Sequence, residues 1–202
     1  MKKLVVFISI IFSCNNSISQ IDSNEVNAYF NEIALKNEFE GTVLTKPNKW
    51  NSDIKIYIKG DRKEYLILEL EKIISELNDL IETINISIVS DSTQSNMPIF
   101  FGSMEEYNTI FPYSKKYSNQ LGLGSLWTNS NNEIYFAKIF VDTKNQLSIS
   151  EEKHVLREEL TQCLGLPNDS WKYPNSIFYQ GWTTETEYSD IDKLLIKKLY
   201  KQ

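Results

Sequence analysis

Histidine and cysteine are scarce in this chain, which has one His and two Cys among its 202 residues. Structural and catalytic zinc sites are usually built from several His or Cys ligands. The composition therefore excludes a histidine-rich metal centre.

An excess of positive charge is also missing, because 21 Lys and Arg stand against 27 Asp and Glu and give a formal net charge of −6. Residues 1–19 contain Lys2 and Lys3 but no acidic residue, so their removal changes this charge to −6 − 2 = −8. A chain this acidic lacks the basic surface that binds nucleic acid, and we expect no nucleic-acid partner.

Internal repeats and low-complexity tracts are absent from the sequence. What is present is a hydrophobic content of 41%, an aromatic content of 12% and a mean hydropathy of −0.35. These values are typical of a soluble globular chain and exclude a disordered, collagen-like or multispanning membrane protein. The length fits one compact unit with a single core.

The N-terminus has the pattern of a secretory leader over residues 1–19. Lys2 and Lys3 precede an apolar run, residues 4–12, which is too short to span a bilayer. We therefore expect an exported protein of the periplasm or cell envelope, or a secreted one.

Two processing sites fit this leader. Ser17 and Ser19 are small residues before Gln20, as signal peptidase requires, and cleavage there would release a soluble protein. Residues 11–14 instead resemble a bacterial lipobox, in which Cys14 would carry a lipid, tether the protein to the outer membrane and provide its only membrane contact. The sequence leaves both alternatives open.

Cys163 is the only other cysteine, so the mature chain has no intramolecular disulfide under either alternative. We expect its side chain to be buried as a small apolar residue.

Periodicity predicts an α+β fold, with helices packed on a mixed, twisted sheet. Alternating Ile54, Ile56 and Ile58 indicate a strand, while a long stripe of Leu and Ile at helical spacing indicates a long amphipathic helix. We expect helices over residues 21–40, 62–84, 148–165 and 189–200, and strands over residues 53–59, 86–90, 98–101, 122–128 and 133–141. The expected organisation is a leader, an N-terminal helix and linker over residues 20–47, and a main domain over residues 48–202.

Residues 158–169 read EELTQCLGLPND. This spacing resembles the zinc-binding signature of metzincin peptidases, His-Glu-x-x-His-x-x-Gly-x-x-His. The resemblance implies that Glu158, Gln162 and Asn168 occupy the three ligand positions. It also implies that Glu159 occupies the position of the general base and Gly165 that of the glycine at which the chain turns.

A second match follows at the expected distance. Ser176, Phe178 and Tyr179 lie in a segment that resembles the Met-turn, with Phe178 in the place of the methionine. Residues 188–200 resemble the closing helix of matrixin-type members. Together these motifs also resemble an uncharacterised bacterial family of putative lipoproteins that has Glu-Glu-x-x-Gln-x-Leu-Gly-Leu-x-Asn-Asp in place of the peptidase residues.

The departures from the peptidase pattern bear on function. One carboxylate and two amide oxygens are hard, weak ligands for zinc, so we expect no zinc cofactor, while calcium, which prefers oxygen, remains open. We expect His154 to be a solvated surface residue. Gln162 and Asn168 are expected to form a hydrogen-bonded pair in place of the metal, and Asp169 to be a turn former.

Two functions compete on these grounds. The first is a zinc-free binding or structural module of the cell envelope, which holds an extended peptide or envelope protein against the edge strand Gly122–Thr128, near Trp127. The second is a hydrolase or hard-metal enzyme in which Glu158, Glu159 and Asp169 act as carboxylates. Glu159, at the apolar border of its helix, is the candidate acid or base.

Overall fold

The computed structural model describes residues 22–36, 43–112 and 119–201. The predicted leader and Cys14 lie outside these residues, and their processing stays a prediction. Within the described part of the chain, no helix is both long and apolar enough to cross a membrane.

One mixed sheet forms the centre of the molecule, and its strands follow the order β1-β6-β4-β2-β3, with β5 paired to β6. All pairings are parallel except that of β5 with β6. The strands are β1 (Lys49–Trp50), β2 (Ile54–Gly60), β3 (Ile86–Ile88), β4 (Met97–Gly102), β5 (Gly122–Thr128) and β6 (Glu133–Asp142). The predicted α+β class with a mixed sheet is confirmed.

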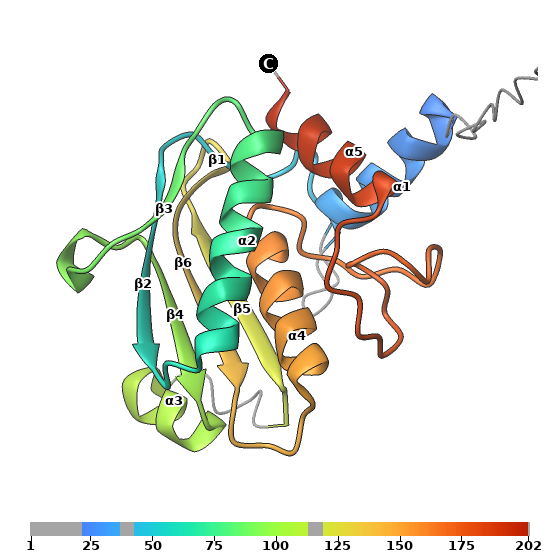
Figure 1. Cartoon of the computed structure of the whole chain (residues 1–202). Coiled ribbons are helices and arrows are strands. Elements are labelled where there is room, and N and C mark those ends of the chain that lie inside the picture. Colours follow the sequence, from blue (N-terminus) through green and yellow to red (C-terminus); the bar gives the residue numbers. More distant parts are fainter. Residues whose placement is uncertain (1–21, 37–42, 113–118, 202) are drawn as a thin grey trace, which may run out of the picture.

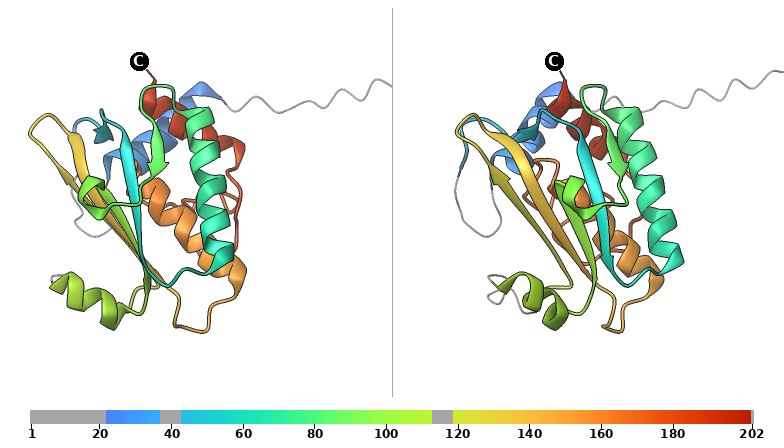
Figure 2. Two further views of the ribbon diagram at one scale, coloured as in Figure 1. Left: turned by 60° about the vertical axis from the view of Figure 1, so that its left-hand side comes forward. Right: turned by 90° about the vertical axis from the view of Figure 1, so that its left-hand side faces the viewer.

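Helices cover one face of the sheet and its end (Figures 1 and 2). They are α1 (Ser23–Leu35), α2 (Glu64–Leu80), α4 (Ile149–Gln162) and α5 (Asp190–Tyr200), while the short α3 (Met104–Ile110) lies on the opposite face. α2 and α4 contact each other, α4 also contacts β5 and β6, and α1 contacts α5. The buried apolar residues of these elements, including Tyr29 and Ile33 of α1, form one main core.

Local sequence explains where these helices begin. Ser148 and Ser189 each accept a hydrogen bond from the backbone N–H three residues on. The Glu151 and Asp192 carboxylates in turn accept hydrogen bonds from the backbone N–H groups of these serines, which completes a capping box at each helix start. The same arrangement of Ser103 and Glu106 begins α3, which the sequence prediction missed.

The long helix is shorter than predicted, at Glu64–Leu80 instead of residues 62–84. Ile81 and Ile84 continue the apolar stripe and are buried, but they reach the core from backbone beyond the helix. The periodicity of buried residues therefore overestimated the helix by one turn. The N-terminal helix, predicted over residues 21–40, likewise ends at Leu35.

Candidate functional site

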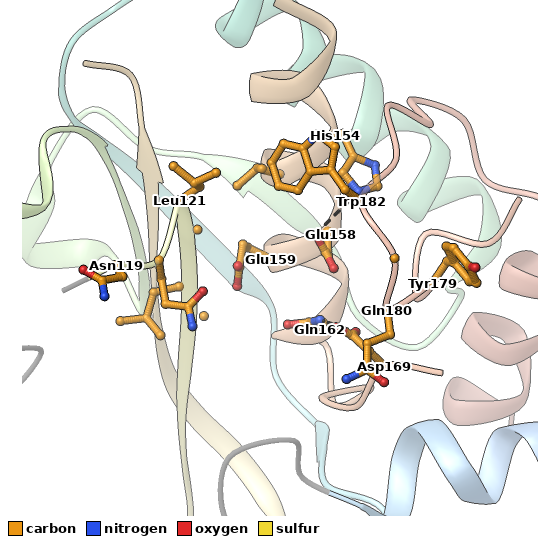
Figure 3. A pocket seen from close by; sticks show the side chains of 16 residues that line it. Asn119, Leu121, His154, Glu158, Glu159, Gln162, Asp169, Tyr179, Gln180 and Trp182 are labelled. Atoms are coloured by element: carbon orange, nitrogen blue, oxygen red, sulfur yellow. Dashed lines mark hydrogen bonds and ion pairs between the residues drawn. The ribbon is translucent and has the colours of Figure 1, made fainter. Parts of the chain in front are cut away.

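A pocket lies between β5, α4 and the segment that follows α4. Its lining includes residues 119–124 on one side, the exposed face of α4 on another, and Asp169 with residues 179–182 on the third. In Figure 3, Glu159 is directed from α4 toward β5, with Gln162 and Asp169 at one end and His154 and Trp182 at the other. The structure thus brings together Glu158, Glu159, Gln162, Asp169 and Tyr179 from the predicted site.

Helix α4 presents its acidic residues to this pocket because its other faces are occupied. Leu156 and Leu160 are fully buried in the main core. Arg157, also fully buried, donates hydrogen bonds to Glu69 (2.7 Å) and Glu76 of α2. The remaining face carries the half-buried Glu158 and Glu159.

Two glycines of β5 make room for the Glu159 side chain. A Cβ on Gly122 would lie 2.4 Å from Glu159 Oε1, and one on Gly124 would lie 3.0 Å from Glu159 Oε2 and 2.9 Å from Cys163 Sγ. The sequence prediction missed both glycines. Their signal was a Gly-x-Gly pattern inside a strand, which often marks a close approach to the backbone.

β5 pairs only with β6 among the described strands, and residues at its start line the pocket. The Asp142 N–H of β6 donates to the Leu121 carbonyl oxygen over 2.8 Å, so the backbone groups of Leu121 face β6. Polar backbone groups alternate sides along an antiparallel ladder. The N–H and C=O groups of Gly122 and Gly124 therefore face away from β6.

Trp127 does not mark the groove as predicted. It lies outside the pocket lining, and its ring packs edge-on against Phe136 (5.3 Å between ring centroids) and beneath the Lys138 ammonium group. Side chains alternate between the two faces of a strand, and Gly122 and Gly124 occupy the face toward α4. Trp127 is on the opposite face.

The expected Gln162–Asn168 pair does not form. Gln162 Nε2 donates instead to Asp169 Oδ1 (2.8 Å), and Asn168 Nδ2 donates to the Asp169 carbonyl oxygen (2.7 Å). Asp169 therefore contacts both Gln162 and Asn168, the first through its side chain and the second through its backbone carbonyl group.

His154 is not a solvated surface residue, since only 3% of its surface is exposed. Nδ1 donates to the Glu185 carbonyl oxygen (2.8 Å), and the Thr183 hydroxyl group lies 3.3 Å from Nε2. Burial lowers the pKa of His154 below its usual value, so the imidazole is neutral at pH 7. The 3.6 Å contact between Nε2 and the Glu158 carboxylate is then no ion pair at that pH.

Gly165 has the turning role that its position implied, with φ at +116°. A Cβ there would also lie 2.0 Å from the Asn48 carbonyl oxygen. The carbonyl groups that end α4 nearby accept hydrogen bonds from distant residues, Cys163 from Trp50 Nε1 and Leu164 from the Tyr200 hydroxyl group, both over 2.9 Å. Cys163 is 2% exposed, as predicted.

The Asp192 side chain holds the segment resembling the Met-turn through hydrogen bonds. Ser176, fully buried, donates to Asp192 Oδ1 (2.5 Å), and the Ile177 N–H donates to Oδ2 (3.1 Å). Phe178 is fully buried in the core. Burial raises the pKa of the Asp192 carboxyl group despite these bonds. Asp192 also belongs to the capping box of α5, so one carboxylate holds both segments.

The residues present do not fit a zinc ion. The amide groups of Gln162 and Asn168 are used to hold Asp169, and the one imidazole, His154, is hydrogen-bonded into the 183–185 segment. Over residues 22–36, 43–112 and 119–201, no three His, Cys, Asp or Glu side chains gather as a metal site.

Comparisons with known proteins assign this sequence to a family. No curated protein matches the chain. Two solved structures of myroilysin, a metzincin-type metalloprotease, are similar to it. One is 14% identical with a TM-score of 0.47, covering 77% of this chain and 83% of the other. The second is 12% identical with a TM-score of 0.48, covering 77% and 86%. The model of a protein family of unknown function, DUF2927, matches residues 23–202, so the chain belongs to this family.

Proposed function

We propose that this protein is an exported, zinc-free binding module of the cell envelope. It holds an extended polypeptide segment along β5, in the groove beside α4, and does not cleave it. The observation that carries the proposal is the orientation of Gly122 and Gly124, which line the pocket and whose backbone N–H and C=O groups face away from β6.

Strand addition needs an edge strand whose backbone N–H and C=O groups point toward the added strand. It also needs pockets for alternate side chains of that strand. β5 supplies the edge, and its two glycines carry no side chains that would obstruct a chain approaching it. The pocket beside it supplies the space for a side chain. None of these features requires a metal.

Peptide binding can be tested with acetylated and amidated heptapeptides, Thr-Val-Thr-Xaa-Thr-Val-Thr, whose β-branched residues favour the extended state. All twenty residues are placed at Xaa and titrated into the ¹⁵N-labelled chain beginning at Gln20. We expect at least one peptide to bind and to slow hydrogen exchange at the Gly122 and Gly124 amides.

Two variants sharpen this test. Gly124→Ala should weaken binding at least fivefold, because its methyl group meets Glu159 and Cys163. Ser125→Ala, one residue on and facing the other side of the strand, should leave binding unchanged. If no peptide binds below about 1 mM, or if protection appears only at amides outside residues 119–128, strand addition to β5 is wrong.

The same samples test the hydrolase hypothesis by mass spectrometry of each peptide after incubation. We expect every peptide to remain intact. Cleavage that disappears in Glu159→Gln would assign the pocket to an enzyme and overturn the non-catalytic function.

Export and lipid attachment are tested on the full chain expressed in a bacterial host. A mature N-terminus at Gln20 would mean a soluble envelope protein, and an acylated N-terminal Cys14 would mean a lipoprotein. A chain that keeps residues 1–19 in the cytoplasm would contradict export.

A further inference from the structure

We propose that the exposed side of α5 binds a membrane surface that carries anionic phospholipid headgroups. This lysine face consists of Lys193, Leu194, Lys197, Lys198 and the C-cap residue Lys201. The inference goes beyond the proposed peptide binding, because none of these five residues lines the pocket beside β5. It follows from the gathering of the lysines, from their pairing and from the place of α5 in the fold.

Core packing determines which side of α5 is left exposed. The buried residues of the helix, including Leu195 and Leu199, pack in the main core. At about 100° per residue, the residues of the lysine face fall within about 140° on the other side. Asp190, at the helix start, is the exposed acidic residue of α5, whereas residues 193–202 contain four lysines and no acidic residue. A chain with a formal net charge of −6 thus carries a local positive face.

The helix dipole explains only part of this pattern. It favours cations near the C-terminus of a helix, and Lys197 and Lys198 lie in the last turn of α5. Lys193 lies near the start of the helix, where the same dipole disfavours a cation. Helix stability therefore does not account for the whole lysine face.

The ammonium groups of this face are available to a ligand. Within the described residues, no acidic side chain forms an ion pair with any of the four lysines. Lys198 lies over the Phe30 ring of α1, with 5.2 Å from Nζ to the ring centroid. Leu194 is 40% exposed among the lysines. Basic side chains around an exposed apolar residue are typical of helices that lie on anionic membranes.

A groove separates the lysine face from acidic residues of another element. Lys197, Lys198 and Lys201 line one side of this groove, while Asp79 and Glu82, at and just beyond the end of α2, line the other. These two carboxylates oppose the attraction of the lysines to headgroup phosphates. Their removal consequently tests the sign of the proposed interaction.

The place of α5 fits both alternatives for the N-terminus. α5 lies beside α1 at one end of the molecule, and α3 lies at the opposite end (Figures 1 and 2). Eight residues separate Cys14 from Ser23, the first residue of α1. A lipid on Cys14 would hold the molecule at the membrane, and the lysine face would orient it there. If cleavage instead occurs before Gln20, the lysine face alone would give reversible, salt-dependent attachment.

Sedimentation with vesicles tests the inference on the chain beginning at Gln20, which carries no lipid. The vesicles contain phosphatidylcholine alone, or phosphatidylcholine and phosphatidylglycerol in a two-to-one ratio. At 50 mM salt we expect binding to the anionic vesicles to be at least tenfold tighter, and we expect it to be lost at 500 mM salt. The net charge of this chain, −6 − 2 = −8, predicts repulsion instead, so binding would be due to a local positive face.

Variants locate the binding. Lys197→Gln with Lys201→Gln should weaken binding to the anionic vesicles at least tenfold, because each lysine near the surface contributes about fivefold. Lys55→Gln with Lys59→Gln removes the same charge from exposed positions of β2 and should leave binding unchanged. An equal effect of the two double variants would mean that only the net charge matters, and would overturn the inference.

The groove provides a variant with the opposite effect. Asp79→Asn with Glu82→Gln removes the two carboxylates that face the lysines, and binding to the anionic vesicles should become at least threefold tighter. Unchanged or weaker binding would contradict a membrane contact at the lysine face.

Three further results would overturn the inference. Equal binding to both kinds of vesicle would mean that the headgroup charge is not recognised. No sedimentation with either kind would mean that the lysine face does not bind a membrane. A dimer without vesicles, dissociated by Lys197→Gln with Lys201→Gln, would assign this face to a second copy of the chain. All three results would leave peptide binding along β5 standing, because it uses other residues.

Discussion

Helix α4 carries charged residues on two faces, and the two faces differ in how far those charged side chains are buried. Toward α2, Glu152 and Arg157 are 2% and 0% exposed. Glu152 accepts hydrogen bonds from Lys63 (2.7 Å) and the Tyr65 hydroxyl group (2.5 Å). Toward the pocket, Glu158 and Glu159 keep part of their surface exposed.

The difference separates a face of α4 that fixes the helix in the fold from a face that the proposed binding would use. Buried charges must be paired and hydrogen-bonded, because water no longer solvates them, so the α2 face fixes the position of α4. The carboxylates of the pocket face retain access to solvent.

Arg157→Met should have the largest effect on stability. It removes a fully buried guanidinium group and leaves Glu69, itself 4% exposed, with one basic partner fewer in the protein interior. Breaking a buried pair in this way costs about 3–5 kcal/mol. The free energy of unfolding, measured in urea, should fall by that amount.

Replacing both partners provides the control. Arg157→Met with Glu69→Met exchanges the pair for apolar side chains, and much of the lost stability should return. If the single variant loses less than about 1 kcal/mol, the charges facing α2 do not hold α4 in place.

Ser176→Ala should have the next largest effect, because the Ser176 hydroxyl group is fully buried. The variant leaves the buried Asp192 without the Ser176 hydroxyl group and removes a contact with the Tyr29 hydroxyl group (3.0 Å). An unsatisfied buried acceptor costs about 1–3 kcal/mol. Ser189→Ala, which removes a half-buried partner of the same carboxylate, should cost less in the same unfolding measurement.

Much of the fold could be predicted from local sequence, because local patterns set local structure. Ser148 and Ser189 cap α4 and α5, so these two helix starts follow from local sequence. The turn-forming residues between Thr128 and Glu133 likewise indicate the hairpin of β5 and β6. Strand β1 was missed because two residues carry no period, and they are placed by pairing with Glu133 and Ile134.

The site was predicted less well, because its contacts join distant parts of the chain. Spacing on α4 identified Glu158, Glu159 and Gln162 as one surface. It could not show that the 183–185 segment would fold back over His154, or that Asp169 rather than Asn168 would pair with Gln162. The neutral histidine at the border between the two faces is a product of that tertiary packing.

His154 should make stability fall as the solution becomes acidic. In the unfolded chain its imidazole titrates near 6.5, whereas burial lowers its pKa in the folded protein. Above about pH 6.5 both states hold it neutral. Below that value the unfolded chain binds a proton that the folded chain does not, so the free energy of unfolding decreases, by at most about 1.4 kcal/mol per pH unit.

The measurement compares urea unfolding of the wild type and His154→Gln at pH 7.5 and 5.5. The carboxylates titrate in both proteins, so their difference isolates the histidine. An equal loss of stability in the two proteins would contradict a neutral, buried His154.

Glu159→Gln should have the smallest effect on stability, and it probes the pocket face most directly. The amide keeps the size of the side chain that lies against Gly122 and Gly124, and the carboxylate that it replaces is half-buried. Because the amide keeps the shape of a partly exposed side chain, we expect the free energy of unfolding to change by less than about 0.5 kcal/mol. A loss as large as that of Arg157→Met would mean that Glu159 is a structural charge like those facing α2. A stable variant with weakened peptide binding would instead divide the two faces of α4 between stability and recognition.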